Sequence, residues 1–116
     1  MTSLDNMRVV IATSMIARAR GLLGTRAEWG DGGRVLVLVL CKSVHTIGMR
    51  YALDIAFADR NGIVLRSERN VRPGRLLSCR RAAFVLERPH RDEAWVEAEQ
   101  RLLVSFSKGF INAQIT

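Results

Sequence analysis

The 116-residue sequence has few of the features that mark secreted, membrane-spanning or disulfide-rich proteins. It holds two cysteines, Cys41 and Cys79, and residues 1–10 lack the basic segment, apolar stretch and small-residue cleavage site of a secretory signal. The longest apolar run, Val35 to Cys41, is far shorter than the roughly 20 residues that a helix needs to cross a bilayer. We therefore expect a cytoplasmic chain without a membrane span, whose two cysteines are reduced thiols.

Aromatic residues are also scarce, at 6% of the chain, and no complete catalytic or metal-binding motif is present. Residues 30–33 (Gly-Asp-Gly-Gly) lack the lysine and the following helix of a phosphate-binding loop, and no enzyme motif surrounds Cys79. Cys41 and His45 are close in sequence, but Cys79 and His90 are farther apart than the ligand pairs of structural zinc sites. We predict no metal and no cofactor.

The composition that is present, 48% hydrophobic and 25% charged, is typical of a globular protein, and the length fits a single domain over residues 1–116. Apolar or alternating patterns predict strands at Met7–Ala12, Arg34–Cys41, Leu53–Asp59, Ile63–Arg69, Ala82–Glu87 and Leu102–Phe106. Because Arg34–Cys41 has no polar alternation, we expect it to be an interior strand with both faces covered. Short helices are expected at Met15–Leu23 and Arg91–Gln100.

A hairpin is the strongest local prediction. Asn61-Gly62 lies between two alternating segments, and this pair readily adopts the positive φ angles of a two-residue hairpin turn. Leu53–Asp59 and Ile63–Arg69 should therefore pair antiparallel. These elements predict a mainly β fold, a small antiparallel jelly-roll-like sandwich or barrel with one or two short helices.

Positive charge is concentrated in one segment. The segment from Arg60 to Arg91 contains nine arginines and only two acidic residues, both glutamates, so it accounts for the whole net charge of +7. Such a segment could attract nucleic acid or an acidic partner through non-specific electrostatics. Side chains of a strand alternate between faces, so Arg66 and Arg69 cannot extend one stripe, and few aromatic residues are available for base stacking.

Several sequence blocks resemble the bacterial and archaeal domain-of-unknown-function family 192, also called uncharacterised protein family 0127. The blocks are Ala12-Thr13-Ser14 with Arg18 and Gly21-Leu22-Leu23, residues 43–50 (SVHTIGMR), residues 53–57 (LDIAF), residues 62–64 (GIV), Pro73, and residues 83–87 (AFVLE). The resemblance implies a small jelly-roll-like β domain and no established activity. The sequence departs from the family pattern at Ala52, where a proline is usual, and at residues 88–91 (RPHR), where Ala-Gly is usual.

Residues 42–52 are predicted to form a loop. The first candidate site is the segment from Lys42 to Asp54, which consists of this loop and the first two residues of the next strand. Its chemistry-bearing residues are His45, Thr46, Met49, Arg50 and Asp54. We expect Arg50 to donate to an anion and Asp54, four residues later, to orient it. The alternative is structural, with Asp54 capping the turn or pairing with Arg50 while His45 faces water.

These observations predict a non-enzymatic binding or accessory domain whose partner is a small anionic ligand or an acidic protein. Two alternatives stay open. A broad arginine surface would favour a nucleic-acid-binding protein, whereas a cleft lined by His45, Arg50 and Asp54 would favour a ligand site or a small enzyme.

Overall fold

The computed structural model describes residues 7–11, 35–39, 41–107 and 110–116, and these residues form nine strands and no helix. The strands are β1 (Met7–Ile11), β2 (Val35–Val39), β3 (Ser43–His45), β4 (Leu53–Ala58), β5 (Val64–Val71), β6 (Leu76–Ser78), β7 (Phe84–Pro89), β8 (Leu102–Ser107) and β9 (Phe110–Ile115). The prediction of a mainly β fold is confirmed. The jelly-roll arrangement stays a prediction.

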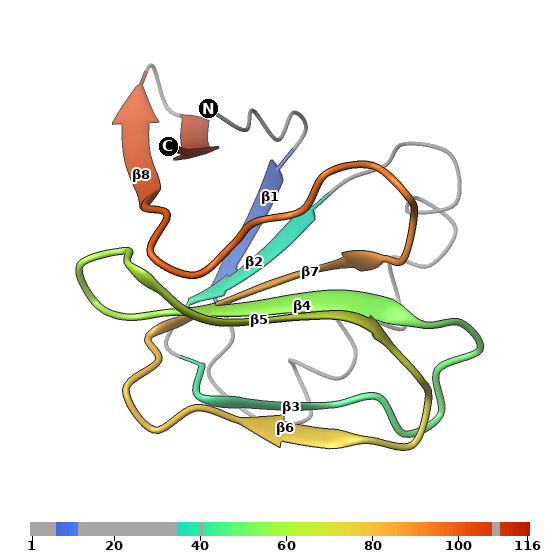
Figure 1. Ribbon diagram of the computed structural model, residues 1–116. Helices are drawn as coiled ribbons and strands as arrows, with labels where there is room; N and C mark the ends of the chain where they lie inside the picture. The colour runs from blue at the N-terminus through green and yellow to red at the C-terminus, as the bar shows by residue number, and fades with distance from the viewer. Residues whose placement is uncertain (1–6, 12–34, 40, 108–109) are drawn as a thin grey trace.

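Five strands form the main sheet in the order β1-β2-β7-β4-β5. β1 and β2 are parallel, and the other neighbours are antiparallel. β3 pairs with β6 in a short antiparallel ribbon, and β8 pairs with β9 in a hairpin. Figure 1 shows the β3–β6 ribbon below the main sheet, with β8 on the opposite side of the view.

The strand β2 is apolar on both faces because both faces of the sheet are covered. Leu36 and Leu38 belong to one buried cluster, and Val35 and Val37 belong to another. β2 has β1 on one side and β7 on the other, so the prediction of an interior strand is confirmed.

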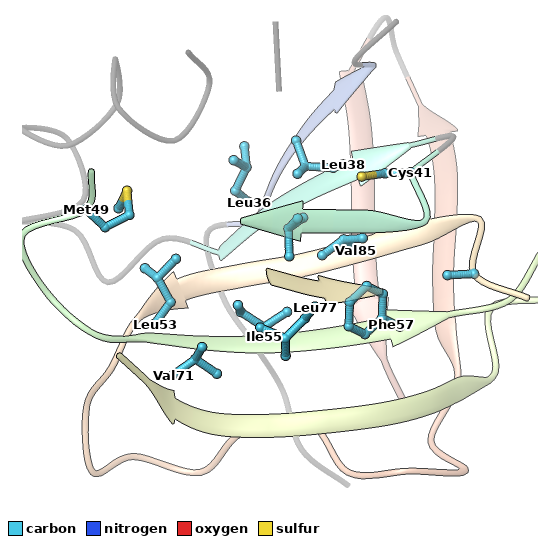
Figure 2. Packing of buried hydrophobic residues seen from close by; sticks show 12 residues of the cluster. Leu36, Leu38, Cys41, Met49, Leu53, Ile55, Phe57, Val71, Leu77 and Val85 are labelled. Atoms are coloured by element: carbon cyan, nitrogen blue, oxygen red, sulfur yellow. The ribbon is translucent and has the colours of Figure 1, made fainter. Parts of the chain in front are cut away.

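The first cluster lies between the main sheet and the β3–β6 ribbon. Leu53, Ile55 and Phe57 of β4 pack there with Val44 of β3 and Leu77 of β6, as Figure 2 shows for the labelled members. The second cluster covers the other face of the sheet and joins it to the segment between β7 and β8. Its members include Ala56, Leu86, Trp95, Val96, Leu102 and Ile115.

The predicted antiparallel pairing across Asn61-Gly62 is confirmed for β4 and β5, but the turn is not the two-residue type. Gly62 N donates to Asp59 O at 2.8 Å and Asp59 N donates to Ile63 O at 2.9 Å, the pattern of a longer loop with a glycine bulge. Gly62 has φ of +86°, whereas Asn61 does not have a positive φ. The carboxylate of Asp59 favours this turn because its Oδ1 accepts from Asn61 N and Ile63 N.

Two other predictions of local structure were wrong. Residues 91–100 are not helical, and their carbonyl groups accept hydrogen bonds from arginine side chains, as described below. The predicted loop 42–52 contains the strand β3, whose three residues are too few to show an alternation in the sequence. The predicted helix Met15–Leu23 lies outside the described residues. Over the described ranges, no helix is long and apolar enough to cross a membrane.

Candidate functional site

Two of the predicted site residues, Thr46 and Met49, are buried in the interior. Met49 is 7% exposed and packs in the cluster under the ribbon. Thr46 is fully buried, and its Oγ1 donates to Arg72 O at 2.8 Å while it accepts from Arg75 N at 2.8 Å. Its backbone N also donates to Arg75 O at 2.8 Å. Thr46 therefore joins the end of β3 to the chain that leads into β6, and its hydroxyl is fully used.

His45 and Arg50 lie closer to the surface. His45 is the last residue of β3 and pairs with Leu76 across the ribbon; it is half-buried. Its Nδ1 is buried and has no hydrogen-bond partner within the described part of the chain. Arg50 is exposed in the bend that precedes β4. The structure brings neither residue to Asp54.

Asp54 is the fully buried centre of a charged network on the other side of the sheet. Arg88 Nε donates to Asp54 Oδ2 at 2.9 Å, and Asn70 N donates to Asp54 Oδ1 at 3.0 Å. His90 Nδ1 lies 2.8 Å from Asp54 Oδ1, and Arg69 Nη2 lies 3.6 Å from Asp54 Oδ2. The predicted pairing of Asp54 with Arg50 was wrong, because side-chain alternation in β4 directs Asp54 toward β5 and β7 partners instead.

The two arginines of this network also hold the segment that replaces the predicted helix. Arg88 donates from Nη2 to Glu93 O at 2.7 Å and from Nη1 to Ala94 O at 3.0 Å. Its guanidinium lies 4.7 Å from the centre of the Trp95 ring. Arg69 Nη2 donates to Arg91 O and Glu93 O. Four hydrogen bonds that fix this segment therefore come from arginine side chains of the sheet and not from the backbone of a helix.

The pKa of Asp54 reflects two opposing causes. Burial raises the pKa, but hydrogen bonds from His90, Asn70 and Arg88 outweigh burial and lower it below its usual value. The carboxylate is thus ionised, and it orients the His90 ring by accepting from Nδ1. The His90 side chain is 30% exposed and that of Arg69 is 41% exposed, so the network reaches the surface through these two residues. Sequence reasoning did not connect His90 and Arg88 with Asp54, although their i, i+2 spacing at the end of a strand was a usable signal.

Glu87 is a second buried acid with different surroundings. It lies in the central strand β7 opposite Leu36 and Ile55, both members of the cluster under the ribbon. Its side chain is fully buried, and neither carboxyl oxygen has a hydrogen-bond partner among the residues that the structure describes. Burial raises the pKa of Glu87 to about 8, so the group is protonated at neutral pH.

A basic pocket of about 650 Å³ opens where the β4–β5 turn meets the β6–β7 connection. Its charged lining consists of Lys42, Arg60, Arg80, Arg81 and Asp59, with Ala82 and Ala83 at its base. All four cations are exposed. Four cationic residues therefore line one concave surface.

The backbone around the basic pocket is fixed by hydrogen bonds. Cys79 N donates to Lys42 O at 2.8 Å, and Ala82 N donates to Cys79 O at 3.1 Å, which closes the turn that carries Arg80 and Arg81. Ala83 N donates to Ala58 O at 2.8 Å and ties this turn to the end of β4. Long cationic side chains therefore extend from rigid positions into the pocket.

A second pocket, of about 450 Å³, lies beside the Asp54 network. Ser67, Arg69, Trp95 and Glu97 contribute to its lining, and Ser67 Oγ already donates to Val96 O at 2.7 Å. Arg69 likewise already donates hydrogen bonds to backbone carbonyls. This pocket thus offers fewer available charged groups than the basic pocket.

The arginines between residues 60 and 91 do not form one stripe. Arg66 lies 6.0 Å from the Phe57 ring and donates to Ser78 O at 3.1 Å, on the side of the ribbon. Arg69 and Arg88 point to the opposite side of the sheet, as the predicted alternation requires. Cys41 and Cys79 are not joined by a disulfide, and the described residues include no cluster of three or more metal-ligating side chains.

Comparison with known proteins gives the family but no activity. A crystal structure of a protein of unknown function from Novosphingobium aromaticivorans DSM 12444 is similar, with 20% identity and a TM-score of 0.58. The match covers 72% of this chain and 62% of that protein, so the chain spans less than two thirds of its structural relative. No curated protein matches the chain. The model of the family DUF192, described as Uncharacterized ACR, matches residues 2–100, and the chain therefore belongs to this family.

Proposed function

We propose that the chain is a binding domain for anionic ligands and that its site is the basic pocket lined by Lys42, Arg60, Arg80 and Arg81. The observation that carries this proposal is the convergence of four cations around about 650 Å³ with one carboxylate among them. This volume lies within the range of small-molecule sites. Lys42 is the first residue of the predicted 42–54 segment, but the predicted site residues His45, Thr46, Met49, Arg50 and Asp54 do not line this pocket.

The one carboxylate of the basic pocket does little to neutralise it. Asp59 Oδ1 accepts from Asn61 N at 2.9 Å and from Ile63 N at 3.0 Å, so this acid is used by the β4–β5 turn. A net positive pocket attracts anions, and guanidinium groups pair with phosphate and carboxylate through two parallel hydrogen bonds. Phosphate-bearing or polycarboxylate ligands are therefore the class that fits.

The chemistry of the lining favours binding over catalysis. Its polar side chains are three arginines, a lysine and an aspartate committed to a turn, and this set lacks a nucleophile paired with a base. Cations on rigid turns hold an anion in place without further chemistry.

The test is a calorimetric titration of the full chain with pyrophosphate at low and high salt. Arg80→Ser with Arg81→Ser should weaken binding by about tenfold or more, since each lost ion pair removes a charge-assisted contact. The control is Arg50→Ser with Arg72→Ser, which removes the same charge from exposed positions outside the basic pocket. The control should bind like the parent.

Two results would overturn the proposal. Equal weakening of binding by both double variants would mean that pyrophosphate binding depends on the net charge of the protein and not on this pocket. Loss of binding in the control alone would place the site at Arg50 or Arg72, outside the basic pocket.

A further inference from the structure

The β3–β6 ribbon carries exposed apolar side chains among basic residues. Val44 and Leu77 point inward and are buried, so the alternation of the ribbon turns their neighbours His45 and Leu76 outward. Leu76 is 69% exposed, and Ile47, two residues beyond His45, is 61% exposed. The third exposed large apolar side chain of the described residues, Leu103, is in β8, away from the ribbon.

The ribbon and its flanking segments contain no acidic residue. Residues 42–53 and 70–81 carry six cations and no aspartate or glutamate. The backbone of Arg72 and Arg75 lies near Ile47, because Thr46, the residue before Ile47, bonds to both, and both arginines are exposed. We name the exposed region made by Ile47, Leu76, Arg72 and Arg75 the ribbon tip.

The backbone of the ribbon tip is rigid. Thr46 O accepts from Gly74 N at 3.0 Å and from Met49 N at 3.1 Å, in addition to the bonds of the Thr46 side chain. Side chains on such a frame hold a fixed spacing, which recognition of a specific partner requires.

We infer that the ribbon tip docks an acidic peptide segment of a partner protein that also carries apolar side chains. The arginines would pair with its carboxylates, and Ile47 and Leu76 would bury against its apolar side chains. Two aliphatic side chains add nothing to phosphate contacts, and the tip has no aromatic residue for base stacking, which argues against nucleic acid. Membrane-surface anchors combine basic residues with a larger apolar face, often with tryptophan or phenylalanine, and the ribbon tip has neither.

The experiment uses the full chain and a fluorescently labelled peptide of glutamates with interspersed leucines, with binding followed by anisotropy. Ile47→Ser with Leu76→Ser should weaken binding by about tenfold or more, and Arg72→Ser with Arg75→Ser should do the same. Leu103→Ser is the control for lost apolar surface, and Arg50→Ser with Arg101→Ser, two exposed arginines outside both the ribbon tip and the basic pocket, is the control for lost charge. Both controls should keep the affinity of the parent within a factor of about two.

A second peptide, with serine in place of leucine, should bind more weakly than the first to the parent chain. Equal binding of the two peptides, or unchanged affinity of the Ile47 and Leu76 double variant, would overturn the inference. So would tighter binding to vesicles of anionic phospholipid or to a single-stranded oligonucleotide, if that binding is lost in the same double variant. Pyrophosphate binding in the basic pocket is measured separately, so each proposal can fail without the other.

Discussion

Arg88 and Asp54 form a salt bridge of 2.9 Å between two fully buried side chains on neighbouring strands. Arg88 also donates to Glu93 O and Ala94 O, so the same side chain joins the sheet to the connection between β7 and β8. His90, two residues after Arg88, also contacts Asp54.

Arg88→Met should lower the free energy of unfolding by roughly 3 to 5 kcal/mol, because it leaves the Asp54 carboxylate buried without its main partner. Chemical denaturation at neutral pH measures the change. The control is Arg66→Met, whose ion pair with Glu68 is about two-fifths exposed and should contribute at most about 1 kcal/mol. Equal losses in the two variants would contradict the structural role of Arg88.

Glu87→Gln should stabilise the protein, and the gain should grow with pH. The pKa of Glu87 is raised from 4.5 to about 8 in the folded chain, so the contribution of this group to stability is fully present below pH 4.5 and is lost as pH rises toward 8. Each pKa unit corresponds to about 1.4 kcal/mol, so the gain should reach a few kcal/mol at pH 8. Unfolding curves of both proteins over this pH range measure it. A gain that does not change with pH would show that Glu87 is ionised in the fold.

Thr46→Val should cost about 1 to 3 kcal/mol of stability, because it keeps the side-chain shape but leaves Arg72 O and Arg75 N without the hydroxyl. Thr46→Ser keeps the hydroxyl and should retain more of the stability. Thermal unfolding of the pair checks this. If Thr46→Val is as stable as the parent, the hydroxyl does not hold the ribbon tip.

Gly62→Ala should destabilise the chain more than Gly48→Ala. Both glycines have positive φ, but a Cβ at Gly62 would lie 2.1 Å from Leu102 O, whereas a Cβ at Gly48 would meet nothing within 4 Å. The Gly48 variant should cost about 1 kcal/mol for its backbone conformation alone. The Gly62 variant must also break the bond from Leu102 N to Gly62 O. Equal denaturation midpoints would show that β8 does not pack closely on this turn.

Most strands were predictable from the sequence because burial imposes a local pattern. The apolar run at β2 and the alternation in β4 each reflect which faces are covered, and the Asn61-Gly62 pair indicated the hairpin. The ribbon strands β3 and β6 have three residues each, too few for a pattern. The segment 91–100 is held by Arg69 of β5 and Arg88 of β7, which its own sequence pattern does not reveal.

The candidate site was less predictable because its contacts join distant residues. The short spacing of Arg50 and Asp54 suggested a pair, but strand register places Asp54 opposite Arg88, 34 residues away. The basic pocket likewise combines Lys42, Arg60 and Arg81 from three separate segments. The net charge of the arginine-rich segment could be counted in the sequence, whereas the fold decides which of its arginine side chains line a pocket.

The central claim is that anions bind in the basic pocket, and the most direct test is to map pyrophosphate on the isotopically labelled chain by amide chemical shifts. The account predicts saturable shifts confined to Lys42, to the turn at residues 59–62 and to the turn at residues 79–82. These amides adjoin the cations that line the pocket. Shifts spread evenly over exposed arginines, or confined to Arg50 and the ribbon tip, would contradict it.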